Sequence, residues 1–188
     1  MESTDPRELL VEIAKRLERL GIPYIVTGGM AVYVWGRPRF TADIDIVIEL
    51  KPEHIGKLET ALRELGAAGY FDPEAARAAI QLNGEFNFID GTTGVKVDFW
   101  TFHADAFDRS RLMRRVPKTI LGTAVYFTTP EDLILIKTKW YRDTLSDKQA
   151  EDVRSIVAVS GAALDRAYLA AWAQRLGITD ALDKLVKL

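Results

Sequence analysis

Apolar residues recur at helical spacing at the start of the chain. Leucine, isoleucine and valine side chains fall on one face of a helix that begins at Pro6 and runs to about Leu20. Asp5 suits the capping position before this helix, and Gly21 is typical of a helix end. The apolar residues 24–27 then predict a short buried strand.

Further along, the pattern alternates between helical and strand spacing. Between positions 43 and 49, acidic and apolar residues alternate, so Asp43 and Asp45 share one face of a predicted strand. The polar, glycine-containing segment 90–94 separates two strands and predicts a hairpin. The pattern predicts helices at 30–35, 52–65 and 73–82, and strands at 43–49, 85–89, 95–101, 119–121 and 124–127.

After position 129 the pattern is helical throughout. Four helices are predicted at 130–142, 147–160, 165–176 and 180–188. Mixed elements followed only by helices predict an α+β fold, in which helices flank a short mixed sheet and a helical bundle ends the chain. We expect residues 1–128 to form the core and 129–188 a helical region packed on it, as one compact unit.

Composition narrows the class of protein. The 25 basic and 27 acidic residues give a formal charge of -2, so no overall positive field favours nucleic acid or an anionic membrane. The absence of cysteine excludes disulfides and thiolate sites. The sequence shows neither a leader pattern nor the ~20 consecutive apolar residues that span a bilayer, which predicts a cytoplasmic protein without membrane contact.

A pair of glycines follows the first predicted strand. Gly28 and Gly29 allow the backbone to approach a ligand closely, and the free N–H groups of the helix that follows favour phosphate oxygens. On this pattern alone, a simple tight turn remains the alternative.

Three carboxylates are candidates for a metal site. Asp43 and Asp45 project side by side from one strand, and Asp98 lies on a later one. Carboxylates are rare in strands and costly to bury unless they are paired or bound to metal, and oxygen ligands suit Mg²⁺, with Mn²⁺ as a substitute. The alternative is a structural domain in which the pair contacts Arg37 and Arg39.

These residues carry a family resemblance. The glycine pair followed by Arg39-x-Thr41-x-Asp43-x-Asp45 resembles the signature of minimal nucleotidyltransferases in the DNA polymerase β superfamily, most closely the AbiEii-like branch, which includes toxins of toxin–antitoxin systems. The resemblance implies the nucleotidyltransferase fold and transfer of a nucleoside monophosphate from an NTP to a hydroxyl. The implied metal ligands are Asp43, Asp45 and Asp98; the implied nucleotide-binding residues are Gly28, Gly29, Arg39, Thr41 and Lys137.

A second stretch extends the resemblance. Thr-Pro-Glu-Asp-Leu at 129–133 precedes Lys137, and Asp152 follows in the next predicted helix. In the AbiEii-like branch a lysine and an acidic residue at these places belong to the active site, which implies catalytic roles for both. One position departs from the pattern: many relatives have serine where this chain has Gly29.

The acceptor is left open by the sequence. A tRNA or protein hydroxyl is the expected acceptor, a small molecule is the alternative, and a cognate antitoxin is a possible partner. The basic run at 109–118 predicts either RNA contact or a solvated face. His54 and His103 have no partners at ligand spacing and are expected to be structural or exposed. A non-catalytic nucleotide- or partner-binding module with the same fold is the competing hypothesis.

Overall fold

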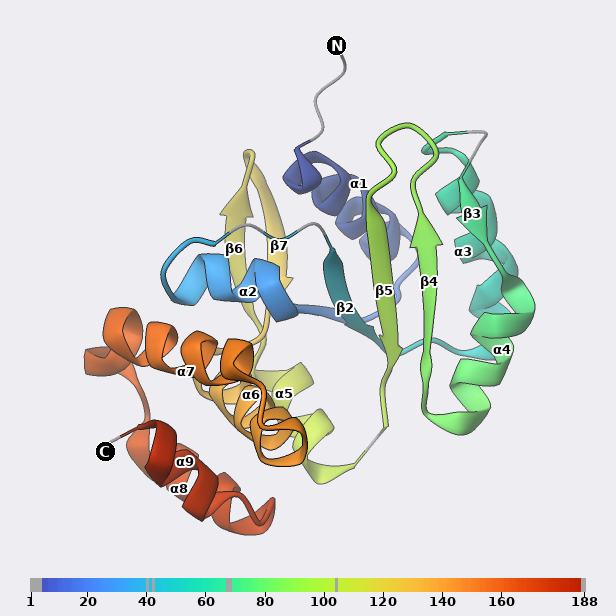
Figure 1. Cartoon of the computed structure of the whole chain (residues 1–188). Coiled ribbons are helices and arrows are strands. Elements are labelled where there is room, and N and C mark those ends of the chain that lie inside the picture. Colours follow the sequence, from blue (N-terminus) through green and yellow to red (C-terminus); the bar gives the residue numbers. More distant parts are fainter. Residues whose placement is uncertain (1–4, 40, 42, 67–68, 104, 187–188) are drawn as a thin grey trace.

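A computed structural model describes residues 5–39, 41, 43–66, 69–103 and 105–186. Its strands form one seven-stranded mixed sheet in the order β3-β4-β5-β2-β1-β7-β6 (Figure 1). The central strands combine both orientations, because β1 runs antiparallel to β2 while β2 runs parallel to β5. The strands are β1 (Tyr24–Thr27), β2 (Ile44–Ile48), β3 (Tyr70–Phe71), β4 (Glu85–Ile89), β5 (Lys96–Thr101), β6 (Val116–Ile120) and β7 (Thr123–Phe127).

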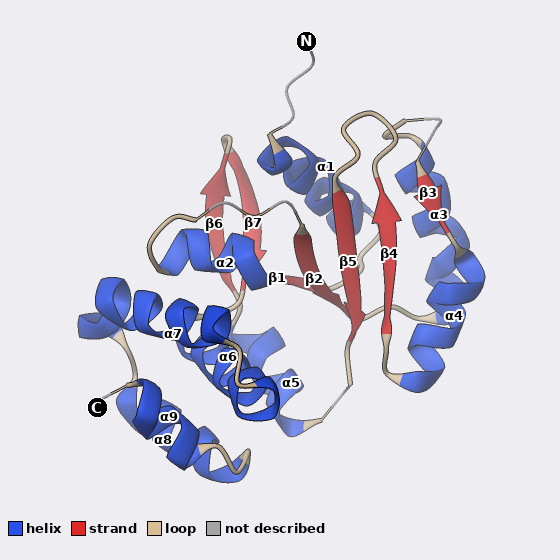
Figure 2. Cartoon of the chain, viewed as in Figure 1, coloured by secondary structure: helices blue, strands red, loops and turns tan. Residues whose placement is uncertain are grey.

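Helices cover both faces of the sheet, with the red strands lying between blue helices in Figure 2. On one face lie α1 (Pro6–Arg19), α3 (Ile55–Arg63), which follows the short 3₁₀ turn η1 (Pro52–His54), and α4 (Pro73–Leu82). On the other lie α2 (Gly28–Trp35), α6 (Pro130–Thr144) and α7 (Asp147–Ser160). The remaining helical elements, near α6 and α7, are α5 (Ala106–Arg114), η2 (Gly161–Ala163), α8 (Arg166–Arg175) and α9 (Thr179–Leu185).

The side chains of β2 alternate between the two faces of the sheet, so one face contributes to the core and the other to the candidate site. Ile44, Ile46 and Ile48 are fully buried. Because side chains alternate along a strand, Asp45 and Val47 point to the opposite face, where α2 and α6 pack. The fold therefore keeps an apolar face for the core and a face with carboxylates for the site.

The mixed α+β architecture predicted from the sequence is confirmed, as are most of its elements. The helices at 73–82 and 147–160 and the strand at 85–89 have the predicted bounds. The prediction for the final helix runs past the described residues, since positions 187–188 lie outside them, and α9 ends at Leu185.

Several elements differ from the prediction. The strand at 119–121 is β6 at Val116–Ile120, and the helix at 52–65 is the 3₁₀ turn η1 followed by α3, which ends at Arg63. The strand at 43–49 begins at Ile44, so Asp43 immediately precedes β2. The helix α5 was not predicted: five of its nine residues are polar and obscure its apolar face, although Asp105 caps its N-terminus by accepting a hydrogen bond from the N–H of Asp108. The strand β3 was also missed, because two residues are too few to show a period of two.

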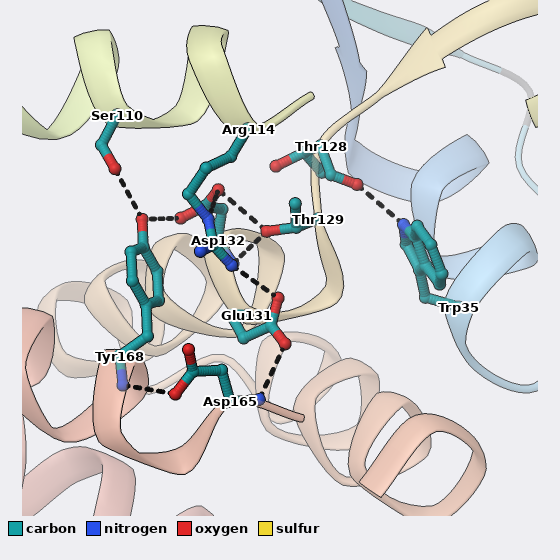
Figure 3. A network of polar contacts seen from close by, with 9 residues as sticks. All are labelled: Trp35, Ser110, Arg114, Thr128, Thr129, Glu131, Asp132, Asp165 and Tyr168. Atoms are coloured by element: carbon teal, nitrogen blue, oxygen red, sulfur yellow. Dashed lines mark hydrogen bonds and ion pairs between the residues drawn. The ribbon is translucent and has the colours of Figure 1, made fainter. Parts of the chain in front are cut away.

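Polar contacts tie the C-terminal helices to the rest of the chain (Figure 3). Glu131 accepts hydrogen bonds from the Asp165 N–H at 3.0 Å and from Arg114 at 3.2 Å. Asp132 is fully buried and accepts a 2.7 Å hydrogen bond from the Tyr168 hydroxyl. The acidic residues of the Pro-Glu-Asp stretch therefore join α6 to α5 and α8, a structural role that their place in the motif did not reveal.

Within the described part of the chain, the longest apolar helical stretches fall short of what is needed to cross a membrane.

Candidate functional site

The glycine pair forms the junction between β1 and α2. Gly28 has a φ of +59°, a left-handed conformation that other residues adopt at a cost. A Cβ added there would overlap the Asp45 carboxylate, and the Gly29 N–H donates a hydrogen bond to that carboxylate. The glycines thus bring the start of α2 directly against β2.

Thr41 occupies the space beside the second glycine. A Cβ on Gly29 would lie 2.5 Å from the Thr41 Oγ1. The Thr41 hydroxyl donates a 3.2 Å hydrogen bond to the Asp43 carbonyl oxygen. The Thr41 side chain therefore fills the space into which a side chain at position 29 would project. The neighbouring Phe40 and Ala42 of the same motif lie outside the described residues.

Two carboxylates stand side by side across neighbouring strands. In the sheet register Thr27 pairs with Asp45, and Asp45 pairs with Asp98. Paired residues of adjacent strands lie ~4.8 Å apart and point to the same face. Asp43 is exposed and lies two positions before Asp45, just outside the strand.

The electrostatics of this row favour a bound cation. Burial raises the pKa of the Asp45 carboxyl, and the charges of Asp98 and Asp43 raise it further. Lys96 Nζ lies 2.8 Å from Asp98 Oδ2 and neutralises part of this charge. Over the residues that the model describes, no three His, Asp or Glu side chains are grouped closely enough to hold a metal ion. The donor set of carboxylate oxygens nevertheless suits Mg²⁺ chemically.

A second charged group lies between α6 and α7. Lys137 Nζ is 2.7 Å from Asp152 Oδ2 and donates a 3.0 Å hydrogen bond to Gln149 Oε1. Arg39 donates from Nε to Asp152 Oδ1 at 2.7 Å and from Nη2 to Oδ2 at 2.9 Å. The carboxylate thus joins two cations that come from distant segments of the chain.

Burial alone would raise the pKa of the Asp152 carboxyl, but the hydrogen bonds and charges of Arg39 and Lys137 hold it below its ordinary value. Burial lowers the pKa of the Lys137 ammonium, which also interacts electrostatically with Asp45. This interaction connects the lysine group to the carboxylate row.

The model therefore gathers the sequence candidates into two adjoining groups. Gly28, Gly29, Asp45 and Asp98 form one, with Thr41 and Asp43 at its edge, and Arg39, Lys137 and Asp152 form the other. Lys96 and Gln149 were missed: Lys96 lies two residues before Asp98 on the same strand face, and Gln149 lies three residues before Asp152 on α7. Those spacings were the available signals.

Much of the basic run at 109–118 makes internal contacts. The Arg114 guanidinium lies 3.7 Å from the Tyr168 ring centroid, Arg115 lies 4.8 Å from that of Tyr126, and Lys118 Nζ lies 4.0 Å from that of Trp35. These contacts favour structural roles, and contact with RNA stays a prediction.

The fold is that of the nucleotidyltransferases. A family model described as "Uncharacterised nucleotidyltransferase" matches residues 6–188, so the chain belongs to this family. None of the curated proteins matches the sequence.

Solved structures of similar fold include two antibiotic-modifying proteins. The antibiotic-resistance factor ANT(2″)-Ia matches with a TM-score of 0.60 and 19% identity, over 93% of this chain and 94% of that one. The lincosamide antibiotic adenylyltransferase LnuA, bound to lincomycin, matches with a TM-score of 0.53 and 12% identity, over 82% and 97%.

A third structure comes from Paracoccidioides brasiliensis. It is an antigenic nucleotidyltransferase-like protein with a TM-score of 0.55 and 19% identity, covering 96% of this chain and 93% of that one. At these identities the three structures establish a shared fold.

Proposed function

We propose that this protein transfers a nucleoside monophosphate from an NTP to the hydroxyl of an acceptor, and that the reaction depends on Mg²⁺. The observation that carries the proposal is the pairing of Asp45 with Asp98 on the face that meets the Gly28–Gly29 turn. Neighbouring carboxylates that are partly buried repel each other, and among the described carboxylates Lys96 contacts only Asp98, which supports the proposal that a further cation binds between Asp45 and Asp98.

Asp45 and Asp98 would hold the metal, with Asp43 completing the set of oxygen ligands. Bound there, Mg²⁺, or Mn²⁺ in its place, would neutralise phosphate charge and activate the attacking hydroxyl. The Asp45 carboxylate already accepts a hydrogen bond from the Gly29 N–H, and it would contact this cation as well.

The chain's own groups supply the remaining chemistry. The acceptor oxygen forms a bond to the α-phosphorus while the bond from that phosphorus to the bridging oxygen breaks, releasing pyrophosphate. Asp98 accepts the proton of the hydroxyl. Lys137 stabilises the charge that develops on the leaving group, and Asp152 with Arg39 fixes the position of that lysine.

Thermal unfolding with Mg²⁺ and ATP tests the proposal without knowledge of the acceptor. Ligand at a hundred times its Kd stabilises a protein by ~2.7 kcal/mol, a rise in Tm of about 5–10 °C for a domain of this size. We expect Asp45→Asn to lose this rise. Its own Tm without ligand should increase, because the neutral amide removes the repulsion with Asp98 and Asp43.

Asp143→Asn is the matched control, since Asp143 is an exposed aspartate at the far end of α6. It should keep the ligand-dependent rise. If Asp45→Asn kept it too, the assignment of the site would be wrong. A wild-type protein that binds Mg²⁺–ATP but releases no pyrophosphate with RNA, protein or small-molecule acceptors would instead be a nucleotide-binding module.

We also propose that the protein acts as a toxin, as the AbiEii-like resemblance implies. The ion pair of Lys137 on α6 with Asp152 on α7 joins the two residues that the resemblance implies for the active site, and this supports the proposal. Induced expression of the wild type and of Asp45→Asn in a bacterial host tests it: growth arrest by the wild type alone is expected. Equal growth of both strains would contradict it.

A further inference from the structure

A cavity of about 220 Å³ lies beneath α6, against the same face of the sheet as the carboxylate row. Val47 and Trp100 contribute from the sheet, Phe107 and Arg111 from α5, and Trp140 from α6. The cavity is smaller than the ~300–1,000 Å³ of sites that hold drug-sized ligands. It therefore has room for one ring-sized portion of a substrate.

Register places the cavity one step from the proposed metal ligands. Val47 pairs with Trp100, two residues beyond the pair formed by Asp45 and Asp98 on the same two strands. Two residues of a strand span ~6.6 Å, and alternate side chains share a face. Thr27, which pairs with Asp45, also lines the cavity. The cavity thus reaches the carboxylate row from below α6.

Unpartnered polar atoms concentrate around this cavity. Seven buried side-chain N and O atoms have no hydrogen-bond partner within the described residues, and four of them belong to cavity residues. They are Thr27 Oγ1, Trp100 Nε1, and Nε and Nη2 of Arg111. Buried donors without partners are rare in proteins, so such a concentration indicates a ligand that supplies acceptor atoms.

The two free nitrogens of Arg111 form a fork. Arg111 is only 5% exposed, and its Nη1 donates to Asp108 Oδ1 at 2.8 Å. This leaves Nε and Nη2, the edge that binds a carboxylate through two parallel hydrogen bonds. Arg39 uses the same two nitrogens to bind Asp152. In Arg39 these two nitrogens already bind a carboxylate, whereas in Arg111 the same two nitrogens have no partner within the described residues.

The carboxylates of the cavity are already satisfied by donors. Asp108 accepts from the His103 N–H at 2.9 Å as well as from Arg111, and Asp105 accepts from the Asp108 N–H at 2.8 Å. Lys139 adds an exposed ammonium at the cavity. The polar groups of the cavity that remain available to a ligand are therefore hydrogen-bond donors and cations.

We propose that this cavity is the acceptor subsite and that it holds a planar ring bearing an oxyanion, with the oxyanion on Arg111 and the ring packed against the Trp100 and Trp140 side chains that line the cavity. This inference rests on the proposed function for the reaction itself, since the hydroxyl of the acceptor must face Asp98. A neutral nucleobase brings no negative charge to the buried Arg111 guanidinium, and a polycation is repelled by it, so an anionic ring is favoured over both.

Binding of three probes of equal size tests the charge preference. The probes are para-hydroxyphenylacetate, its neutral amide and the cation tyramine, and the signal is the Trp100 indole N–H resonance, assigned with Trp100→Phe. The anion should bind about tenfold or more tightly than tyramine, because a hydrogen-bonded charge pair contributes ~1.5–3 kcal/mol. Phenyl phosphate, run in parallel, distinguishes a preference for phosphate from one for carboxylate.

Variants of the charged residues show which side chain causes the preference for the anionic probe. Arg111→Gln should abolish the preference for the anion, and Lys139→Gln, an exposed change that leaves the core intact, should reduce it. Lys148→Gln is the control, since this exposed lysine of α7 does not line the cavity. If Arg111→Gln fails to fold, Lys139→Gln still reports on the charge requirement.

Three results would overturn the proposal: equal or tighter binding of tyramine, no perturbation of Trp100 by any ring probe, or competition between the anion and a non-hydrolysable ATP analogue. The last would place the nucleotide in the cavity. Because binding of Mg²⁺–ATP is measured separately in thermal unfolding, failure of the acceptor proposal is distinguishable from failure of the proposed function.

Discussion

Lys137 and Asp152 form an ion pair in which both side chains are only 3% exposed, with 2.7 Å between Nζ and Oδ2. Burying two charges is costly, and the pair is stable only because each partner satisfies the other. Arg39 and Gln149 complete their hydrogen bonds. The positive charge of Lys137, which the proposed reaction uses, therefore also contributes to the stability of the fold.

Removal of one partner should destabilise the protein strongly. We expect Lys137→Met to lower the free energy of unfolding by about 3–5 kcal/mol, because it leaves Asp152 buried with one fewer cation. Urea denaturation measures the loss. Arg142→Gln is the control, since it removes an exposed pair with Asp143 on the same helix and should change little. Equal losses of unfolding free energy in the two variants would show that burial of the Lys137–Asp152 pair does not increase its contribution to stability.

Acidification should weaken the wild type through Asp152. Its folded-state pKa lies below that of the unfolded chain, because Arg39 and Lys137 favour the charged form. The folded state then binds fewer protons, so this contribution is present above the unfolded pKa of ~3.9 and is lost as the pH falls through the folded pKa. Urea denaturation from pH 6 down to about pH 3 should show a shallower decline for Asp152→Asn than for the wild type. Parallel declines would refute the assignment.

Gly28 should tolerate substitution less well than another glycine of similar conformation. Gly28→Ala introduces strain at a φ of +59° and a clash with Asp45. Gly94 has a φ of +71° and nothing within 4 Å of an added Cβ, so Gly94→Ala measures the strain alone, about 1–2 kcal/mol. Gly28→Ala should cost more and should also abolish stabilisation by Mg²⁺–ATP.

Gly29 and Thr41 should be coupled. Gly29→Ser places a side chain where Thr41 Oγ1 now lies, so the single variant should be destabilised. Thr41→Gly removes both the hydroxyl and the Cβ, which lie 2.5 Å and 2.8 Å from the added Cβ, so the double variant should recover about 0.5–3 kcal/mol relative to additivity. Chemical denaturation of the four proteins gives this coupling energy. Strict additivity would mean that the Thr41 side chain does not limit the space available at position 29.

Local patterns predicted most of the fold but not the pairings that complete the site. The helix from Pro6 and the strand that carries Asp98 follow from spacing over a few residues, which the sequence displays directly. The contact of Arg39 with Asp152 joins segments more than a hundred positions apart, and no periodicity encodes it. The open fork of Arg111 is likewise a consequence of how α5 packs, and α5 itself was not predicted.

The pairing of β1 with β7 has a consequence for how the protein is made. Val26, just before the glycine turn, pairs with Phe127, and Asp152 follows later still. Contacts between such distant segments form slowly, because a long loop must close before they contribute. A nascent chain that has emerged only as far as β6 therefore exposes an incomplete sheet, and the site is assembled only once α7 has also emerged.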